Sequence, residues 1–372
     1  MNSTGVSGTP REGPDGVGAA VFEGIGAGAG EVLTRPLCTL LSRQVQRMFP
    51  TCIVKQNFTN GGVSMLNLHR LFLLHELRRL ETMTAVANAH SMSPSAVSQQ
   101  LSHLERETKT TLFQQVGRRV VLTDAGVQLA RRAEEMLGLL ETAEAELALA
   151  QGEASGLLRA ASFQTPMIAL APAAVSVLAQ QHPQLQLEMS QQEVEAAYEG
   201  LLAHRFDVIL GEDYPGGQRV VRRGTDREAL LRDPLLLVLP DAGPWADAQT
   251  LGDLADAPWA LDPSGSRTGI WARTFLRQAG LEPRVSFTTS DPLLQVHLVR
   301  TGHAVAFVPG IIASEHLGGT RVVRLPGDPH RSLYTAARAG AAGHPSLLAF
   351  RAALLEAAGT LSSLEGLEHF RH

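Results

Sequence analysis

Cysteine is almost absent from this chain of 372 residues, which has only Cys38 and Cys52. Two cysteines at that spacing give neither a disulfide framework nor a CxxC pair, so the sequence favours a reducing compartment. No uncharged apolar run is long enough to cross a bilayer. The first residues are rich in glycine, serine and proline and lack the basic-then-apolar order of a secretory signal. These absences predict a cytoplasmic protein with no membrane partner.

The chain also lacks an overall basic excess, since its formal net charge is −5. That value argues mildly against a nucleic-acid binder, but the charges are distributed unevenly. Within residues 65–122 the positive side chains outnumber the negative ones, and the rest of the chain carries the acidic excess. The positive residues there are Arg70, Arg78, Arg79, Arg106, Lys109, Arg118 and Arg119, against Glu76, Glu81, Glu105 and Glu107. A weakly basic segment on an acidic body favours a specific DNA reader over a non-specific coat protein.

Signals for cofactors, metals and catalysis are weak. Residues 24–29 satisfy the letters GxGxxA, but no aspartate or glutamate follows between residues 32 and 75 to bind a ribose. The spacing of His297, His303 and His316 matches no zinc pattern. No nucleophile-elbow motif is present either. We therefore predict no cofactor, no metal site and no enzymatic activity.

Residues 1–64 differ in character from the rest of the chain. They are glycine-rich and show no amphipathic period apart from a possible short helix at 34–48. We expect this segment to be a disordered extension preceding a domain that begins at Met65. A regulatory arm is the alternative.

A helix-turn-helix pattern begins at Leu68. An apolar stripe at helical spacing covers residues 68–80, and Thr82 is placed to cap a second short helix. Ser93 follows as an N-cap, with Pro94 at the first helical position, where a missing N–H costs nothing. The third helix has an apolar face at three- and four-residue spacing, made of Ala96, Val97, Leu101 and Leu104.

A wing and a long helix follow. Apolar residues on both sides of residues 117–119 predict two short strands joined by a tight turn. Thr123 and Asp124 then cap a helix that extends to about residue 150, within a linker of residues 123–155 that ends in a hinge at 152–156. The apolar positions of this helix recur at the spacing of a helix that packs along a partner helix. They are Val127, Ala130, Ala133, Leu137, Leu140, Ala143 (or Glu144 in strict register) and Leu147.

Residues 156–358 alternate short apolar strands with helices, and residues 359–372 read as a tail. Such alternation predicts parallel sheets covered by helices, and its restart after residue 223 predicts two lobes with a cleft between them. Strands are expected at 157–162, 185–189, 207–210, 235–239, 258–261, 284–288, 304–308 and 322–325. Helices are expected at 166–181, 193–204, 268–279, 291–301 and 346–358.

The sequence resembles the LysR-type transcriptional regulators in several spaced segments, strongly over residues 65–150. These segments are residues 82–87 (TMTAVA), 93–101 (SPSAVSQQL), 104–105, 112–113, 117–119 and 122–126 (LTDAG). The match is looser downstream, at residues 233–240 and 302–309. The resemblance implies an N-terminal winged helix-turn-helix, a long linker helix and a two-lobed α/β effector domain of the periplasmic-binding-protein type. It also implies a DNA-binding regulator, homodimeric or homotetrameric, whose promoter binding responds to a small-molecule effector.

The third helix would place short polar side chains toward the major groove. Gln99 can form two hydrogen bonds with adenine, and Ser98 can serve several bases or a phosphate. Thr84 can meet a phosphate at the start of the second helix, and the wing arginines can reach phosphate or the minor groove. The family often has Gln-Pro where this chain has Pro94-Ser95, and arginine at position 99, so the preferred bases stay open. The predicted DNA-binding residues are Thr84, Pro94, Ser95, Ser98, Gln99, Ser102, His103, Arg118 and Arg119.

The effector site is expected where helices of the two lobes begin, because free N–H groups and the positive end of the helix dipole favour a ligand there. Ser290 is expected to be the N-cap of its helix. The resemblance implies a small organic acid as the effector, since many effectors of the family belong to this class. No arginine or lysine lies within the three loops that precede these helices, although Arg267 is close to one of them. The predicted effector-binding residues are Gln164, Thr165, Ser264, Ser266, Ser290 and Asp291.

Two other classes of protein remain as alternatives. A solute-binding protein uses the same two-lobed domain but requires export, for which no secretory signal is present. An enzyme acting in the cleft would require a catalytic constellation that the sequence does not show.

Overall fold

The computed structural model describes residues 65–116, 119–217, 222–361 and 368–369. The predictions for residues 1–64, including the short helix at 34–48, and for Arg118 lie outside the described residues. In the described part of the chain no helix is long and apolar enough to cross a membrane. Nor does that part bring three or more His, Cys, Asp or Glu side chains together in a way that could hold a metal ion.

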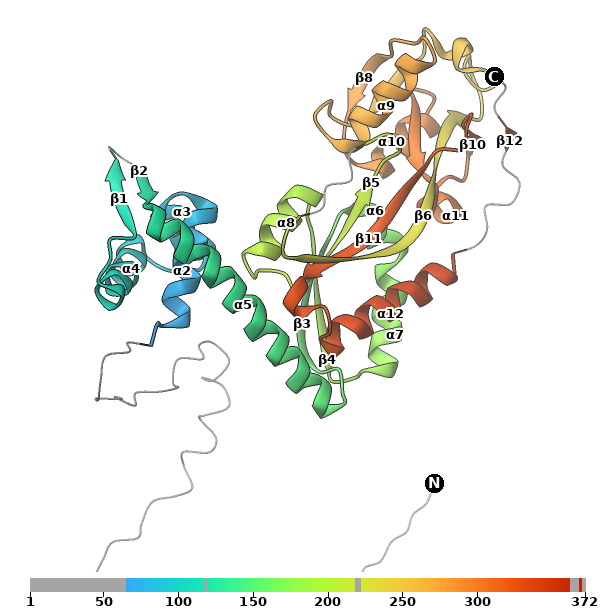
Figure 1. Ribbon diagram of the computed structural model, residues 1–372. Helices are drawn as coiled ribbons and strands as arrows, with labels where there is room; N and C mark the ends of the chain where they lie inside the picture. The colour runs from blue at the N-terminus through green and yellow to red at the C-terminus, as the bar shows by residue number, and fades with distance from the viewer. Residues whose placement is uncertain (1–64, 117–118, 218–221, 362–367, 370–372) are drawn as a thin grey trace, which may run out of the picture. The chain divides into compact units, whose positions relative to one another are not determined.

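Three helices and a two-stranded wing form the first part of the described chain (Figure 1). Each helix begins at a side chain that satisfies a free N–H of its first turn: Asn67, Thr82 and Ser93 accept from the amides three residues ahead. This confirms the predicted helix starts after Thr82 and Ser93. The elements are α2 (Leu68–Leu80), α3 (Met83–Ala89), α4 (Pro94–Thr108), β1 (Phe113–Val116) and β2 (Arg119–Leu122).

A charged residue lies in the core between α2 and α3. Glu76 is fully buried, and it accepts hydrogen bonds from Arg79 at 2.9 and 2.8 Å and contacts His90 Nε2 at 2.7 Å. Burial opposes ionisation of this carboxyl, but the hydrogen bonds from Arg79 and His90 outweigh it and lower the pKa of Glu76 to about 2. Glu76 therefore joins the end of α3 to α2 as a carboxylate.

We expect Glu76→Gln to destabilise the protein by about 3 kcal/mol at pH 7, because it leaves Arg79 without its buried partner. The folded pKa is depressed, so the carboxylate contributes full stability above its unfolded pKa near 4.5 and loses it as the pH falls toward 2. Urea unfolding monitored by circular dichroism at several pH values should therefore show the gap between wild type and variant shrinking from pH 5 to pH 2. Glu81→Gln, at an exposed position after the same helix, is the control. A gap that does not change with pH would contradict this assignment.

The long helix α5 (Asp124–Gln151) begins against the wing. Thr123 caps it by accepting from the Gly126 amide at 3.1 Å. A Cβ atom at Gly126 would lie 2.0 Å from the Leu112 carbonyl oxygen, so only glycine allows this approach. Ala130 and Ala133 are fully buried in the core that α2 and α4 form.

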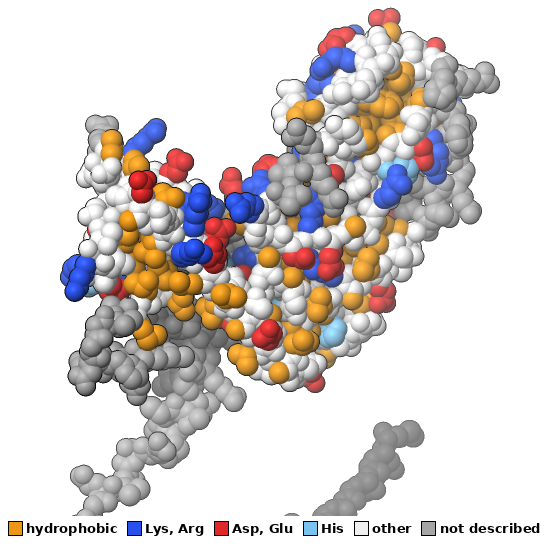
Figure 2. All heavy atoms as spheres, in the orientation of Figure 1, with side chains coloured by type: hydrophobic (Ala, Val, Ile, Leu, Met, Phe, Trp, Pro, Cys, Tyr) orange, Lys and Arg blue, Asp and Glu red, His pale blue; other side chains and the backbone are white. Residues whose placement is uncertain are grey.

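The second half of α5 presents apolar side chains to solvent, as Figure 2 shows along this helix. Met136 and Leu140 are each 40% exposed and Leu147 is 67% exposed. The predicted apolar stripe thus has two different roles. Its N-terminal members at residues 130 and 133 pack inside the chain, which corrects the expectation that the whole stripe faces a partner helix, and the stripe is open only beyond residue 135.

The remaining residues form two α/β lobes joined into one sheet system (Figure 1). The strands are β3 (Gly156–Ser162), β4 (Leu185–Gln191), β5 (Val208–Asp213), β6 (Thr225–Pro240), β7 (Pro258–Leu261), β8 (Arg284–Thr288), β9 (Val305–Pro309), β10 (Thr320–Arg324), β11 (His330–Arg338) and β12 (Glu368–His369). The helices are α6 (Gln164–Ala169), α7 (Ala171–Gln181), α8 (Val194–Leu202), α9 (Arg267–Gln278), α10 (Pro292–Arg300), α11 (Ala313–His316) and α12 (Pro345–Gly359), with short 3-10 turns η1 (Leu251–Leu254), η2 (Gly310–Ile312) and η3 (Ala339–Ala341).

The long strand β6 belongs to both lobes. The first lobe has the strand order β4-β3-β5-β11-β6, in which β6 contributes residues 225–234. The second lobe continues as β6-β9-β7-β8, in which β6 contributes residues 235–240, and β10 also pairs with this end of β6. The chain therefore crosses between the lobes within β6 and returns between β10 and β11.

The sheets are parallel only in part. The predicted parallel pairing holds for β3 with β4 and β5, and for β7 with β8 and β9. However, β11 is antiparallel to β5 and β6, and β6 is antiparallel to β9. Strand β11 was not predicted, and β6 begins ten residues before the expected strand. β6 and β11 complete the sheets with antiparallel pairs. A simple alternation of strands and helices does not predict such pairs.

Other boundaries also differ from the predictions. The helix expected at 166–181 is divided into α6 and α7 at Leu170. In the segment expected to be a tail, the short strand β12 pairs with β10. In the second lobe, the rings of Trp259 and Trp271 lie 5.0 and 5.3 Å from that of Phe307, which anchors α9 on the sheet.

Candidate DNA-binding and effector sites

Helix α4 has one fully buried face and one polar face. Val97, Leu101 and Leu104 are 0% exposed and fix the helix on the core formed with α2 and α3. On the opposite face, Pro94, Ser95, Ser98 and Gln99 are exposed, whereas Ser102 and His103 are only half-buried. The predicted contact residues therefore gather at the N-terminal end of the helix, the end that reaches base edges in helix-turn-helix proteins.

A network that the sequence pattern does not reveal holds α4 against α2. Arg70 donates from Nε to Gln100 Oε1 at 3.1 Å and forms an ion pair with Glu107. Both partners lie on α4, on the side facing α2 rather than on its exposed face. Arg70 was counted among the positive charges of this segment, but its charge is paired with that of Glu107 within the protein.

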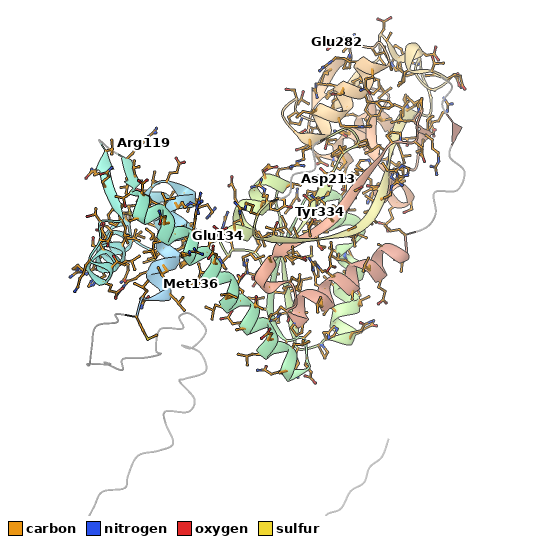
Figure 3. The ribbon with its side chains drawn as sticks, viewed as in Figure 1. Arg119, Glu134, Met136, Asp213, Glu282 and Tyr334 are labelled. Atoms are coloured by element: carbon orange, nitrogen blue, oxygen red, sulfur yellow. The ribbon has the colours of Figure 1, made fainter. Side chains whose placement is uncertain are left out.

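The wing carries an arginine at its tip. β1 and β2 pair antiparallel, with Val116 opposite Arg119 at the last described position of each strand. Arg119 is exposed and extends from the beginning of β2 (Figure 3). Thr84 is exposed in the first turn of α3, next to the capping Thr82. Both side chains are therefore accessible from solvent.

In the effector domain, Thr165 lies in a buried charged cluster. It is 4% exposed, and its Oγ1 accepts a hydrogen bond from Arg331 Nη2 at 2.7 Å. Arg331 is itself buried and also donates to Asp233 Oδ2 at 2.8 Å and to Glu212 Oε2 at 2.7 Å. One guanidinium thus joins α6, β5 and β6 where the chain crosses between the lobes. This geometry is typical of a fully hydrogen-bonded buried ion pair.

The structure also brings Gln164 and Asp291 together, 127 residues apart in sequence. Gln164 Nε2 donates to Asp291 Oδ1 at 3.0 Å, linking the start of α6 to the start of α10. The same Asp291 oxygen accepts from the amides of Leu293 at 2.9 Å and Leu294 at 3.3 Å. Asp291 is therefore the N-cap of α10, which corrects the prediction that Ser290 has this role. The reason is that Pro292 occupies the first helical position, so the cap falls on the residue just before it.

The three predicted serines have different surroundings. Ser266 is the N-cap of α9 and accepts from the Gly269 amide at 3.0 Å. Ser264 and Ser290 are exposed in the loops before α9 and α10. Capping occupies the Ser266 oxygen, so among the three serines the hydroxyls of Ser264 and Ser290 are the more accessible.

A further carboxyl lies at the end of β7. Asp262 accepts from Gln295 Nε2 at 2.9 Å, and Gln295 also donates to the Thr289 carbonyl oxygen. Burial raises the pKa of Asp262 to about 6, which the Gln295 hydrogen bond only partly opposes. Nearby, Tyr214 Oη lies 2.8 Å from Thr268 Oγ1 and joins the end of β5 to α9.

Several of these residues were not predicted: Glu212, Asp233, Asp262, Gln295 and Arg331. The available signal was the position of three of them, since Glu212 lies near the end of β5, Asp262 directly follows β7, and Asp233 lies within β6 just before its buried apolar residues. Ligands in α/β sheets bind outside the carboxyl ends of the strands, where Glu212 and Asp262 lie. No local signal marks Arg331, because its partners are far away in sequence.

Comparison with protein families gives two matches. Residues 68–127 match the bacterial regulatory helix-turn-helix protein of the lysR family. Residues 151–359 match the LysR substrate binding domain. The two matches cover the wing-bearing segment and both lobes.

The chain is also similar to named regulators. It is 28% identical to the HTH-type transcriptional regulator PtxR of Pseudomonas aeruginosa, over 70% of this chain and 82% of that protein. It is 27% identical to the RuBisCO operon transcriptional regulator of Allochromatium vinosum, over 80% of this chain and 98% of that protein. These relatives are transcriptional regulators and not solute-binding proteins.

Solved structures agree in fold. A full-length OxyR variant from Pseudomonas aeruginosa superposes with a TM-score of 0.56 at 19% identity, covering 78% of this chain and 95% of that one. A cysteine mutant of OxyR from Corynebacterium glutamicum gives a TM-score of 0.51 at 18% identity, covering 82% and 98%. Family matches over both parts of the chain, named relatives and shared fold agree: the chain belongs to the LysR family of DNA-binding transcriptional regulators, with a two-lobed effector-binding domain.

Proposed function

We propose that the protein binds promoter DNA through the N-terminal end of α4 and through the wing. The observation that carries this proposal is the division of α4 into a fully buried face and an exposed face of short polar side chains. Ser95, Ser98 and Gln99 are short enough for the helix backbone to approach base edges in the major groove. Arg119 and Thr84 are both exposed, and in this proposal they contact phosphates. Pro94, Ser102, His103 and Arg118 complete the proposed DNA-binding residues.

The test is binding of the full-length protein to the intergenic region beside its own gene, by gel shift and fluorescence anisotropy. We expect nanomolar to sub-micromolar affinity, with log K falling linearly as log salt concentration rises, because phosphate contacts release counterions. A scrambled fragment of equal length should bind at least ~10³-fold more weakly. Equal affinity for both fragments would contradict sequence-specific binding.

We propose that a small-molecule effector binds between the starts of α6, α9 and α10. Gln164 and Asp291 already connect two of these helix starts, so a ligand that replaced their 3.0 Å hydrogen bond would act on both lobes at once. Thr165, Ser264, Ser266 and Ser290 complete the proposed set, with Ser266 positioning α9 through its capping bond. Both cysteines precede residue 53, so a thiol cannot be the sensing group of this domain.

The charge of the effector is open to a direct test. Small organic acids are the class that the family resemblance suggests, yet Asp291 already occupies the first amides of α10 with a carboxylate. Thermal-shift screening of the full-length protein against matched sets of organic acids, neutral sugars and amines distinguishes these classes. Stabilisation by an acid that disappears in Gln164→Ala would support an anionic effector at this site. If only amines stabilise the protein, the organic-acid proposal is wrong and amines become the proposed effector class.

We propose that the exposed half of α5 forms a homodimer seam. Met136, Leu140, Ala143 and Leu147 follow one another at four, three and four residues, the spacing of a helix that packs along a second helix. The second copy of the chain is the partner that fits such a stripe in a family whose members act as oligomers. We also propose that the protein acts in the cytoplasm, where promoters are located. We propose no enzymatic activity for it.

Leu140→Glu with Leu147→Glu is expected to convert the oligomer to a monomer at micromolar concentration, because two carboxylates would have to be buried in the seam. Sedimentation velocity measures the change. Thr142→Glu, exposed on another side of the same helix, is the matched control and should leave the oligomer intact. If the double variant sediments like wild type, the seam lies elsewhere.

A further inference from the structure

Strand β11 carries an arginine near each end, and the two make contacts in different parts of the protein. Arg331 forms the buried cluster that holds Thr165 of α6. Arg338, seven residues later and about 23 Å along the strand, lies at its other end. Between them β11 is hydrogen-bonded on both sides, to β5 and to β6. A strand in the interior of a sheet shifts as a unit with its neighbours rather than bending by itself.

Arg338 connects the first lobe to the linker helix. Its Nη1 donates to the carbonyl oxygens of Leu201 at 2.9 Å and Phe206 at 2.7 Å, at the end of α8. Its Nε donates to Glu141 Oε1 on α5. The guanidinium is largely buried, with 12% of the side chain exposed, so this ion pair is less screened than a surface pair.

The residues directly after β11 bring α5 very close. A Cβ atom at Gly340 would lie 2.4 Å from the carbonyl oxygen of Gly138 and 2.9 Å from Glu141 Cβ. Only glycine permits this contact between η3 and α5. The linker helix therefore contacts the end of β11 both through a salt bridge and through close backbone packing.

We propose that β11 couples the effector site to the linker helix, with Arg338 as the positioning residue that holds Glu141. This inference rests on the proposed role of Thr165 at the effector site. A ligand that displaces α6 changes the Thr165–Arg331 hydrogen bond and the position of β11. Arg338 and Gly340 then carry that displacement to α5, the helix proposed to form the dimer seam.

The test is a double-mutant cycle in the full-length protein, with amide hydrogen exchange of α5 residues 138–147 as the readout. Thr165→Ala removes one hydrogen bond from Arg331, and we expect it to accelerate exchange in this part of α5 by three-fold or more. In an Arg338→Gln background, the same Thr165→Ala change should add no acceleration. No response of α5 to Thr165→Ala, or an equal response in both backgrounds, would overturn the coupling.

Two further variants keep the result interpretable. Glu141→Gln breaks the contact from the linker side without altering β11, and it serves as the second background if Arg338→Gln does not fold. Arg300→Gln is the matched control, because Arg300 also donates to carbonyl oxygens, of His316 and Gly318, but in the second lobe. It should leave the α5 response unchanged, and loss of the response in this variant would also overturn the proposal. Failure of DNA binding in the wild type would reject the proposed function without affecting the exchange result.

Discussion

Arg331→Met is expected to lower the free energy of unfolding of the effector domain by about 4 kcal/mol. The guanidinium is the shared partner of two buried carboxylates, Glu212 and Asp233. Removing it leaves both without a cation in the protein interior, where an uncompensated charge is costly. Urea unfolding of the full-length protein, followed by tryptophan fluorescence, measures the loss, because Trp245, Trp259 and Trp271 all lie in the effector domain.

The same experiment separates charge from packing. Adding Glu212→Gln and Asp233→Asn to Arg331→Met removes the two uncompensated charges and should restore at least a third of the lost stability. Arg300→Met, at an exposed arginine of the second lobe, is the control and should cost less than about 1 kcal/mol. A loss of less than about 1 kcal/mol for Arg331→Met would show that the carboxylates accept protons or water at little cost.

Ser98→Ala combined with Gln99→Ala is expected to weaken binding to the promoter site by about 100-fold, while binding to unrelated DNA changes little. A bidentate contact from glutamine to adenine contributes about 1–3 kcal/mol of discrimination, and the serine hydroxyl adds a smaller amount. Arg119→Gln should behave differently, because a phosphate contact carries no sequence information. It should weaken binding to all sequences and reduce the salt slope by about 1.

Fluorescence anisotropy with specific and scrambled duplexes at several salt concentrations measures both effects. Gln128→Ala, at an exposed glutamine on α5, is the control and should leave affinity and salt slope unchanged. If the double variant lowers the affinities for the specific and the scrambled duplex equally, Ser98 and Gln99 contact phosphates rather than bases. If it lowers neither, base reading resides on another surface.

The winged helix-turn-helix could be predicted closely because its determinants are local. Ser93 and Pro94 specify a helix start by themselves, and Val97, Leu101 and Leu104 mark its buried face by spacing. A cap, an N1 proline and a three-four repeat all act within one or two turns. Such features are readable without knowing what else the chain contacts.

The crossing strands of the effector domain could not be predicted in the same way. β11 contains a buried arginine, and a charged residue in a short apolar run argues against a buried strand when only neighbouring residues are considered. Its partners Glu212 and Asp233 are 119 and 98 residues away. For the same reason the pairing of Gln164 with Asp291 was not visible, although both residues were predicted effector contacts. Stabilisation that depends on distant partners has no local pattern.

The two roles of α5 show a related limit. Ala133 and Leu140 lie on one repeating stripe, but the first is fully buried and the second is exposed. Periodicity identifies an apolar face and does not say what covers it. What covers the face depends on where α2 ends, because the part of the stripe beyond that point is not covered.

The shared strand β6 and the returning strand β11 have a consequence for engineering this protein. The first lobe takes residues 330–338 from beyond the end of the second lobe, so the first lobe does not correspond to a continuous stretch of sequence. A chimera that grafts a foreign sensor onto this DNA-binding module therefore has one sensible junction, near Gly152, where α5 ends with a left-handed glycine. A junction between residues 213 and 225 would leave the first lobe with β3, β4 and β5 alone. A junction between residues 240 and 330 would remove β11, which pairs with both β5 and β6, and either change leaves an unpaired sheet edge prone to aggregation.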